Sequence, residues 1–145
     1  IQYGGSMKPS NAKELLENLK AAGIPMTIAT STNKYCIVAA FDRLGYTGYF
    51  DMILTCPELG THKSEPDIFY AALDAMGTEP AETWVFEDGL YAIKTAKAEG
   101  FKTVGIFDEA SKAEQRELKA LSDIYVESLE DFFYEHIEIE GTERV

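Results

Sequence analysis

The stretch "WVFEDGLYAIKTAKAEG", residues 84–100, joins a short apolar run to two adjacent acids and an alanine-rich segment. The apolar run ends directly in Glu87 and Asp88, and Gly89 then leads into a helical pattern that closes at Gly100. Carboxylates at the end of a buried strand are costly unless a metal ion, a lysine or backbone donors compensate for them. The stretch therefore predicts a strand–acid–helix unit and a cationic group beside it.

The alternation of a short apolar strand with a helix repeats along the chain. We expect helices at 11–22, 34–44, 66–76, 90–99, 111–121 and 128–134, and strands at 24–29, 50–55, 83–86, 102–107 and 124–126. Short strands that are apolar on both faces and alternate with helices of 10–12 residues indicate an open parallel sheet covered by helices. The predicted fold class is α/β.

The bulk properties set the domain organisation and exclude some partners. With 145 residues, 46% of them apolar, the chain has the size and core of one domain, and its longest apolar runs are too short to span a bilayer. A net charge of −12 argues against nucleic acid and anionic membrane as partners. We expect a connecting segment or cloning residue at 1–9, a core at 10–134 and an acidic tail at 135–145.

The two cysteines, Cys36 and Cys56, lack the spacing of a metal site, and the chain shows no export signal. Both are expected to be reduced core residues of a cytoplasmic protein.

Polar residues cluster where three of the predicted strands end. Thr30, Ser31, Thr32 and Asn33 follow the first strand, Lys63 lies in the loop after the second, and Glu87 and Asp88 follow the third. Taken singly, these groups have structural explanations: helix capping for the hydroxyl cluster, a solvated surface position for the lysine, and first-turn acids favoured by the helix dipole.

Ligands bind at the carboxyl ends of the strands in such sheets, so these groups are expected to converge. Hydroxyls with helix-start amides bind oxyanions, a lysine neutralises them, and Asp with Glu binds Mg²⁺, so together the groups predict phosphate chemistry. His62 is expected to be a loop residue rather than a base, His136 to be solvated, and Tyr91 to pack.

The order of motifs resembles the haloacid dehalogenase superfamily, in particular its phosphatase and β-phosphoglucomutase-like branch. The resemblance covers about residues 7–134 and rests on "GIPMTIATST" (23–32), "HKSEPDIF" (62–69) and "VFEDGLYAIKTAKAEGFKTVGI" (85–106). Ser64 stands where that branch often has proline. The resemblance implies a Rossmann-like sheet with helices on both faces.

The resemblance also implies roles for individual residues. Thr30 and Ser31 would bind the transferring phosphoryl group, and Lys63 would stabilise the charge on that group and on the nucleophile. Asp88 would be a Mg²⁺ ligand, with Glu87 a further ligand or a supporting partner, and Asn33 would touch the substrate.

The nucleophile of that family is missing from this sequence. The family uses Asp-x-Asp at the end of a central first strand, followed by a cap domain, and the chain contains no Asp-x-Asp. Without that strand the sheet would be left as two parts with unpaired inner edges, and activity of the chain alone is not expected. Three explanations stay open: a piece of a larger protein, a truncated relative completed by a partner or a rearranged sheet, and exchange between two copies.

Two hypotheses about function follow, one for an enzyme and one for a binding module. The first is the C-terminal core portion of a Mg²⁺-dependent phosphatase acting on small phosphorylated metabolites through an aspartyl-phosphate formed outside this chain, with phosphomutase activity as a close variant. The second is a non-catalytic phosphate-binding or assembly module. A response-regulator receiver is a weaker rival, because its acids come first in the chain and here they come last.

Overall fold

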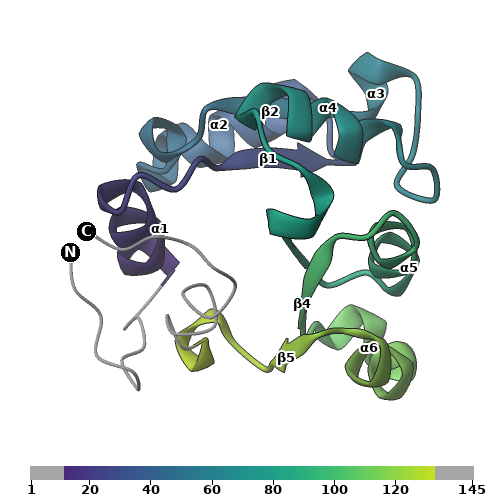
Figure 1. Cartoon of the computed structure of the whole chain (residues 1–145). Coiled ribbons are helices and arrows are strands. Elements are labelled where there is room, and N and C mark those ends of the chain that lie inside the picture. The colour runs from purple at the N-terminus through teal and green to yellow at the C-terminus, as the bar shows by residue number, and fades with distance from the viewer. Residues whose placement is uncertain (1–11, 133–145) are drawn as a thin grey trace.

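The computed structural model describes residues 12–132 and shows helices alternating with strands (Figure 1). The helices are α1 (Ala12–Ala21), α2 (Lys34–Leu44), α3 (Cys56–Leu59), α4 (Asp67–Met76), α5 (Leu90–Ala98) and α6 (Gln115–Leu121). The strands are β1 (Thr27–Thr30), β2 (Met52–Thr55), β3 (Trp84–Glu87), β4 (Lys102–Ile106) and β5 (Ile124–Val126). Short 3₁₀ turns are η1 (Thr47–Tyr49), η2 (Pro80–Glu82), η3 (Glu109–Glu114) and η4 (Leu129–Asp131).

The five strands found among residues 12–132 form two parallel sheets. β1 pairs with β2, and β3, β4 and β5 pair in that order. Within residues 12–132, β1 and β3 each pair along one edge only. This division confirms the α/β class and matches the expected two-part sheet that lacks a central strand.

Two apolar clusters join the sheets on opposite faces. On one face, Leu15 and Leu19 of α1 pack with Val104 of β4, Val126 of β5 and Phe132. On the other face, α4 and α5 pack against side chains of β1, β2 and β3. Successive residues of β3 alternate between the clusters, as the two-residue period of a strand requires. The molecule is therefore a layered α/β structure with helices on both faces.

Capping residues explain where the second helix lies. The Asn33 side chain accepts a hydrogen bond from the backbone N–H of Tyr35 at 2.8 Å, and Gly45 ends the helix with a left-handed backbone at φ 74°. The sequence prediction of 34–44 for this helix is confirmed.

Several predicted boundaries were wrong. The first strand begins at Thr27 rather than residue 24, because Met26 forms two hydrogen bonds with Asp51 instead. The Met26 backbone N–H donates to the Asp51 carboxylate at 2.9 Å, and the Asp51 backbone N–H donates to the Met26 carbonyl at 2.7 Å. The loop predicted at 56–65 contains α3, which Thr55 caps. The last helix, predicted at 128–134, is only the turn η4 over its described residues, and the helix at 111–121 begins as the turn η3.

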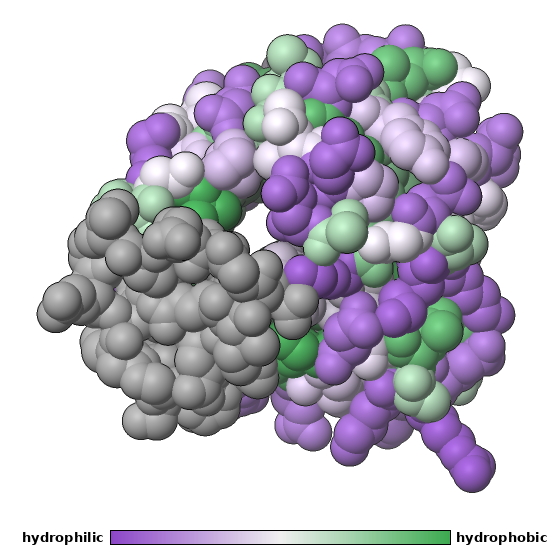
Figure 2. All heavy atoms as spheres, viewed as in Figure 1, coloured by the Kyte–Doolittle hydropathy of each residue, from purple (hydrophilic) through white to green (hydrophobic). Residues whose placement is uncertain are grey.

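The expected segments 1–9 and 135–145 lie outside the described residues. No helix among residues 12–132 is long and apolar enough to cross a membrane. On the face that Figure 2 shows, the described residues are mostly hydrophilic, with small separate apolar patches.

Asp123 connects β4, β5 and α5 through hydrogen bonds. Its carboxylate accepts bonds from the Thr103 backbone N–H at 2.8 Å, the Thr103 hydroxyl at 3.1 Å and the Lys97 ammonium at 2.8 Å. Partial burial raises the pKa of Asp123, but these hydrogen bonds outweigh it and hold the pKa below its ordinary value of 3.8. The ionised form is therefore bound more strongly in the folded protein than in the unfolded chain.

We predict that Asp123→Asn weakens the acid sensitivity of folding. A lowered folded-state pKa contributes stability above the unfolded pKa of 3.8, and this contribution disappears as the pH falls through the folded value. The difference in unfolding free energy between wild type and variant should thus shrink as the pH falls from 6 toward about 3, as measured by urea unfolding. Asp74→Asn, at an exposed position of α4, controls for the change in net charge. A difference that stays constant with pH would contradict the prediction.

Candidate functional site

A buried ion pair lies where the two sheets meet. Lys63, in the loop after α3, places its Nζ 2.6 Å from Oε2 of Glu87, the last residue of β3. Both side chains are only 10% exposed. The pair joins a segment that follows the first sheet to a strand of the second.

The second oxygen of Glu87 is occupied by the backbone that follows it. Oε1 accepts the N–H groups of Asp88 at 3.1 Å and Gly89 at 3.2 Å. Burial raises the pKa of Glu87, but the Lys63 charge, hydrogen bonding to Asp88 and Lys63, and the Gly89 N–H outweigh it, so the pKa is lowered. Glu87 is therefore held ionised and fixed in orientation.

Asp88 is the exposed member of the acid pair. The pKa of Asp88 is raised above its ordinary value. Burial, hydrogen bonding to Glu87 and the Glu87 charge raise it, and they outweigh the backbone N–H of Asp88 and the Lys63 charge, which lower it. The Lys63 ammonium thus acts on both acids, and the structure brings these three residues to one place.

Thr30 is the last residue of β1, which belongs to the other sheet, and Ser31 follows it. Thr30 pairs with Thr55 in the sheet, and its Oγ1 accepts the backbone N–H of Thr32 at 3.1 Å. The Ser31 hydroxyl lies 3.8 Å from the Sγ of buried Cys56. Between residues 12 and 132, no hydrogen bond links Thr30 or Ser31 to the Lys63–Glu87 pair.

Other residues named from the sequence have local roles in the structure. Asn33 caps α2, and His62 is exposed and pairs with Glu65 at 3.1 Å. Tyr91 was expected to pack, but it is 49% exposed. Of the two cysteines expected in the core, Cys56 is buried and Cys36 is exposed, so that expectation was wrong for Cys36. His136 lies outside the described residues.

The donor set suits a hard cation only in part. Asp88 offers an exposed carboxylate, whereas both oxygens of Glu87 accept hydrogen bonds. In the described part of the chain, no group of three or more His, Cys, Asp or Glu side chains could hold a metal ion. Mg²⁺ is commonly held by one or two carboxylates together with water and substrate phosphate, so Asp88 fits as one ligand.

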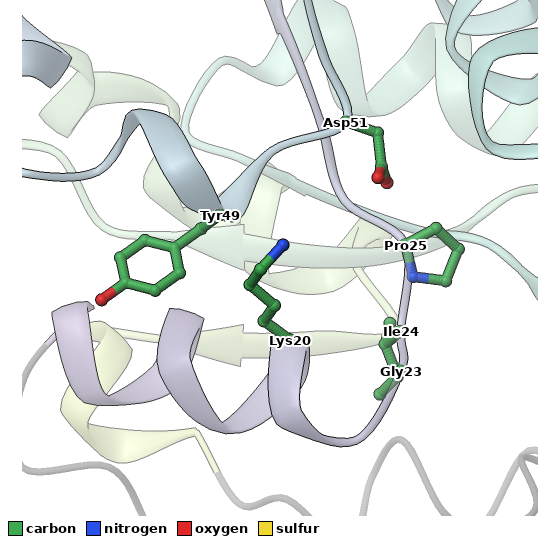
Figure 3. A pocket seen from close by; sticks show the side chains of 6 residues that line it. All are labelled: Lys20, Gly23, Ile24, Pro25, Tyr49 and Asp51. Atoms are coloured by element: carbon green, nitrogen blue, oxygen red, sulfur yellow. The ribbon is translucent and has the colours of Figure 1, made fainter.

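A shallow pocket of roughly 260 Å³ lies elsewhere, where α1 leads into β1 (Figure 3). It is lined by Lys20, Gly23, Ile24, Pro25, Tyr49 and Asp51. These residues precede β1 and β2, so the pocket lies at the amino ends of the strands, whereas Thr30 and Glu87 stand at carboxyl ends. Ligands of open parallel sheets bind at carboxyl ends, which favours the Lys63 site over this pocket.

Sequence reasoning missed two contacts beside the site. Cys56 was assigned to the core, and its contact with Ser31 required knowing that β1 and β2 are neighbours. The ring of Tyr91 lies over Gly89, where an added Cβ would be 2.8 Å from the ring carbon Cε1. The adjacent Gly and Tyr were visible in the sequence, but the rotamer that brings them together was not.

We predict that Lys63→Met destabilises the chain strongly. The substitution keeps an unbranched apolar stem and leaves the Glu87 charge buried without its partner, which typically costs about 3–5 kcal/mol. The matched control is Lys34→Met, which breaks the exposed Lys34–Glu58 pair (3.6 Å) and should cost less than about 1 kcal/mol. Urea unfolding at pH 7 measures both. Equal effects of the two substitutions would contradict a buried pair.

The sequence of this chain matches a known protein family and several of its members. Residues 7–106 match the family model described as haloacid dehalogenase-like hydrolase. The chain is 28% identical over 126 residues to validoxylamine A 7'-phosphate phosphatase of Streptomyces hygroscopicus, covering 87% of this chain and 57% of that protein. It is 33% identical over 108 residues to ribulose-1,5-bisphosphate 5-phosphatase of Halopiger xanaduensis, covering 74% and 45%.

A solved structure shows the same fold. The crystal structure of a HAD phosphatase from Thermococcus onnurineus matches with a TM-score of 0.74 at 28% identity, covering 94% of this chain and 59% of that one. The chain thus spans about half the length of the curated relatives that it matches. The matched family model, the phosphatase relatives and the shared fold lead to one conclusion: the chain belongs to the haloacid dehalogenase-like hydrolases.

Proposed function

We propose that this chain forms the phosphate-binding core portion of a phosphatase that hydrolyses small phosphate monoesters. The observation that carries the proposal is the buried Lys63–Glu87 pair at the carboxyl end of β3, with Asp88 beside it. A fixed ammonium with an adjacent exposed carboxylate suits a phosphoryl group accompanied by a cation. The phosphatase names of the relatives support the same reaction class.

Each residue has a defined part in this proposal. Lys63 stabilises charge on the phosphoryl oxygens and is oriented by Glu87. Thr30 accepts the Thr32 N–H, which leaves its hydroxyl hydrogen available to donate to a phosphoryl oxygen. Ser31 would bind phosphate through its backbone N–H, and the Asn33 side-chain amide would donate to the substrate while its oxygen caps α2.

Mg²⁺ is the proposed cofactor, with Asp88 as the protein ligand. When bound, the ion would neutralise phosphate charge and polarise the phosphoryl group. Glu87 contributes by orienting Lys63 and the Asp88 backbone, because both of its oxygens already accept hydrogen bonds. A cytoplasmic location stays part of the proposal.

The nucleophile would come from outside this sequence, as an aspartate on a strand that pairs with β1 and β3. Each of these strands has one edge without a partner among the described residues. Apolar clusters on both faces join the two sheets, so a short apolar strand would bury side chains on either side. Attack by that carboxylate on phosphorus would form an aspartyl-phosphate and break the bond to the ester oxygen, which leaves as the alcohol after taking up a proton. Water would then hydrolyse the aspartyl-phosphate to inorganic phosphate and restore the carboxylate. A further segment of a longer protein, a second copy or a partner chain could supply the strand.

A non-catalytic module that only binds phosphate is the alternative, favoured by the lack of Asp-x-Asp in the sequence. Phosphomutase activity is a variant of the phosphatase proposal, because the same residues would bind the phosphoryl group. Binding without turnover by the complete protein would support the module, and transfer of phosphate back to a sugar would support the mutase.

We predict that Lys63→Ala and Thr30→Val each reduce kcat/KM of the complete protein by about 10²–10³-fold, because each removes a donor aimed at the phosphoryl oxygens. The measurement is release of inorganic phosphate from a panel of phosphate monoesters with Mg²⁺ present. Asp88→Asn should raise the Mg²⁺ concentration required for half-maximal activity.

Tyr70→Phe, which removes a hydroxyl bonded to Glu99 on the outer surface, is the control and should retain wild-type activity. Loss of activity in the control, or unchanged activity in Lys63→Ala, would contradict the assignment. Thermal unfolding of each variant separates lost chemistry from lost folding.

A further inference from the structure

The first turn of α5 presents one solvent-exposed side chain beside the acids. Leu90 and Ala92 are buried, whereas Tyr91 is 49% exposed. Side chains in helices lean toward the helix N-terminus, and the Tyr91 ring follows this rule by lying back over Gly89. The ring is therefore directed toward the end of α5 at which Glu87 and Asp88 stand.

Gly89 gives the ring the space that it occupies. Its backbone, at φ −93° and ψ 124°, is open to any residue, so conformation does not require glycine. A Cβ at this position would lie 2.8 Å, 3.3 Å and 3.5 Å from the Cε1, Cδ1 and Cζ atoms of Tyr91. Any side chain at position 89 would displace the ring, so the two residues act as a unit.

The ring lies against the backbone that holds the acid pair. The N–H of Gly89, the residue beneath the ring, donates to Oε1 of Glu87 at 3.2 Å. The Tyr91 hydroxyl has no hydrogen-bond partner between residues 12 and 132, so it is not tied to the protein surface there. An apolar face with a polar tip thus lies beside the acids that would border the proposed phosphoryl group.

We propose that Tyr91 is a specificity-determining residue whose ring contacts the carbon skeleton of the substrate. The inference rests on the proposed phosphatase function. Lys63 contacts the end of β3 and Asp88 follows it, and these two residues would hold the phosphoryl group. An organic group that extends from there past the start of α5 meets the exposed Tyr91 ring. Its C–H groups can pack on the aromatic face while its polar groups remain in water or reach the phenol.

The test measures the KM for fructose 1-phosphate and the inhibition constant of inorganic phosphate on the complete protein with Mg²⁺. Tyr91→Ala should raise that KM about tenfold or more, with the inhibition constant changed less than about twofold, because phosphate has no carbon skeleton to contact. Tyr91→Phe should keep most of the affinity. Tyr70→Ala, a tyrosine of similar exposure on α4, should leave both constants unchanged.

Gly89→Ala provides an independent arm, since it displaces the ring without removing it. It should raise the KM as Tyr91→Ala does, and the double variant should be no worse than Tyr91→Ala alone. A KM unchanged in Tyr91→Ala, an equal loss for inorganic phosphate, or additive effects of the two substitutions would overturn the inference. Wild-type protein that neither binds nor releases phosphate would overturn the proposed function, and this inference with it.

Discussion

The ion pair between Lys63 and Glu87 is the interaction on which the site depends. Removing both charges from water is expensive, and the cost is offset only where geometry is good and the remaining oxygens are satisfied. Here the pair is 2.6 Å long, and the second Glu87 oxygen accepts two backbone N–H groups. The strand–acid–helix unit of residues 84–100 thus has its compensating cation, Lys63, supplied by a loop that follows the other sheet.

The same pair connects the site to the architecture. In the described part of the chain, the strands divide into sheets of two and three strands, and apolar clusters join these sheets on both faces. Among the described residues, Lys63–Glu87 is the buried polar link between the two parts, while Tyr70–Glu99 is an exposed one. A strand added between β1 and β3 would therefore end between polar residues that are already in place, with Thr30 at the end of β1 and Glu87 at the end of β3.

Much of this arrangement could be predicted from the sequence, and the failures have physical causes. The parallel α/β class followed from short apolar strands alternating with helices, and α2 was placed correctly because Asn33 and Gly45 mark its ends. The start of β1 was misjudged because its limit is set by Asp51, a residue 25 positions away. That Lys63 lies close to Glu87 and Asp88 was expected from the order of the strands. The hydrogen bonds to both Glu87 oxygens and the position of the Tyr91 ring depend on side-chain rotamers, which no local sequence pattern encodes.

A double-mutant cycle measures whether Lys63 and Glu87 form a stabilising buried pair. The unfolding free energy is measured for wild type, Lys63→Met, Glu87→Gln and the double variant at pH 7. If the two groups form a buried pair, each single substitution leaves the other group unpaired, and the double variant should lose much less stability than the sum of the two single losses. Additive losses would show that the two charges do not interact, and that Lys63 and Glu87 do not form the site described above.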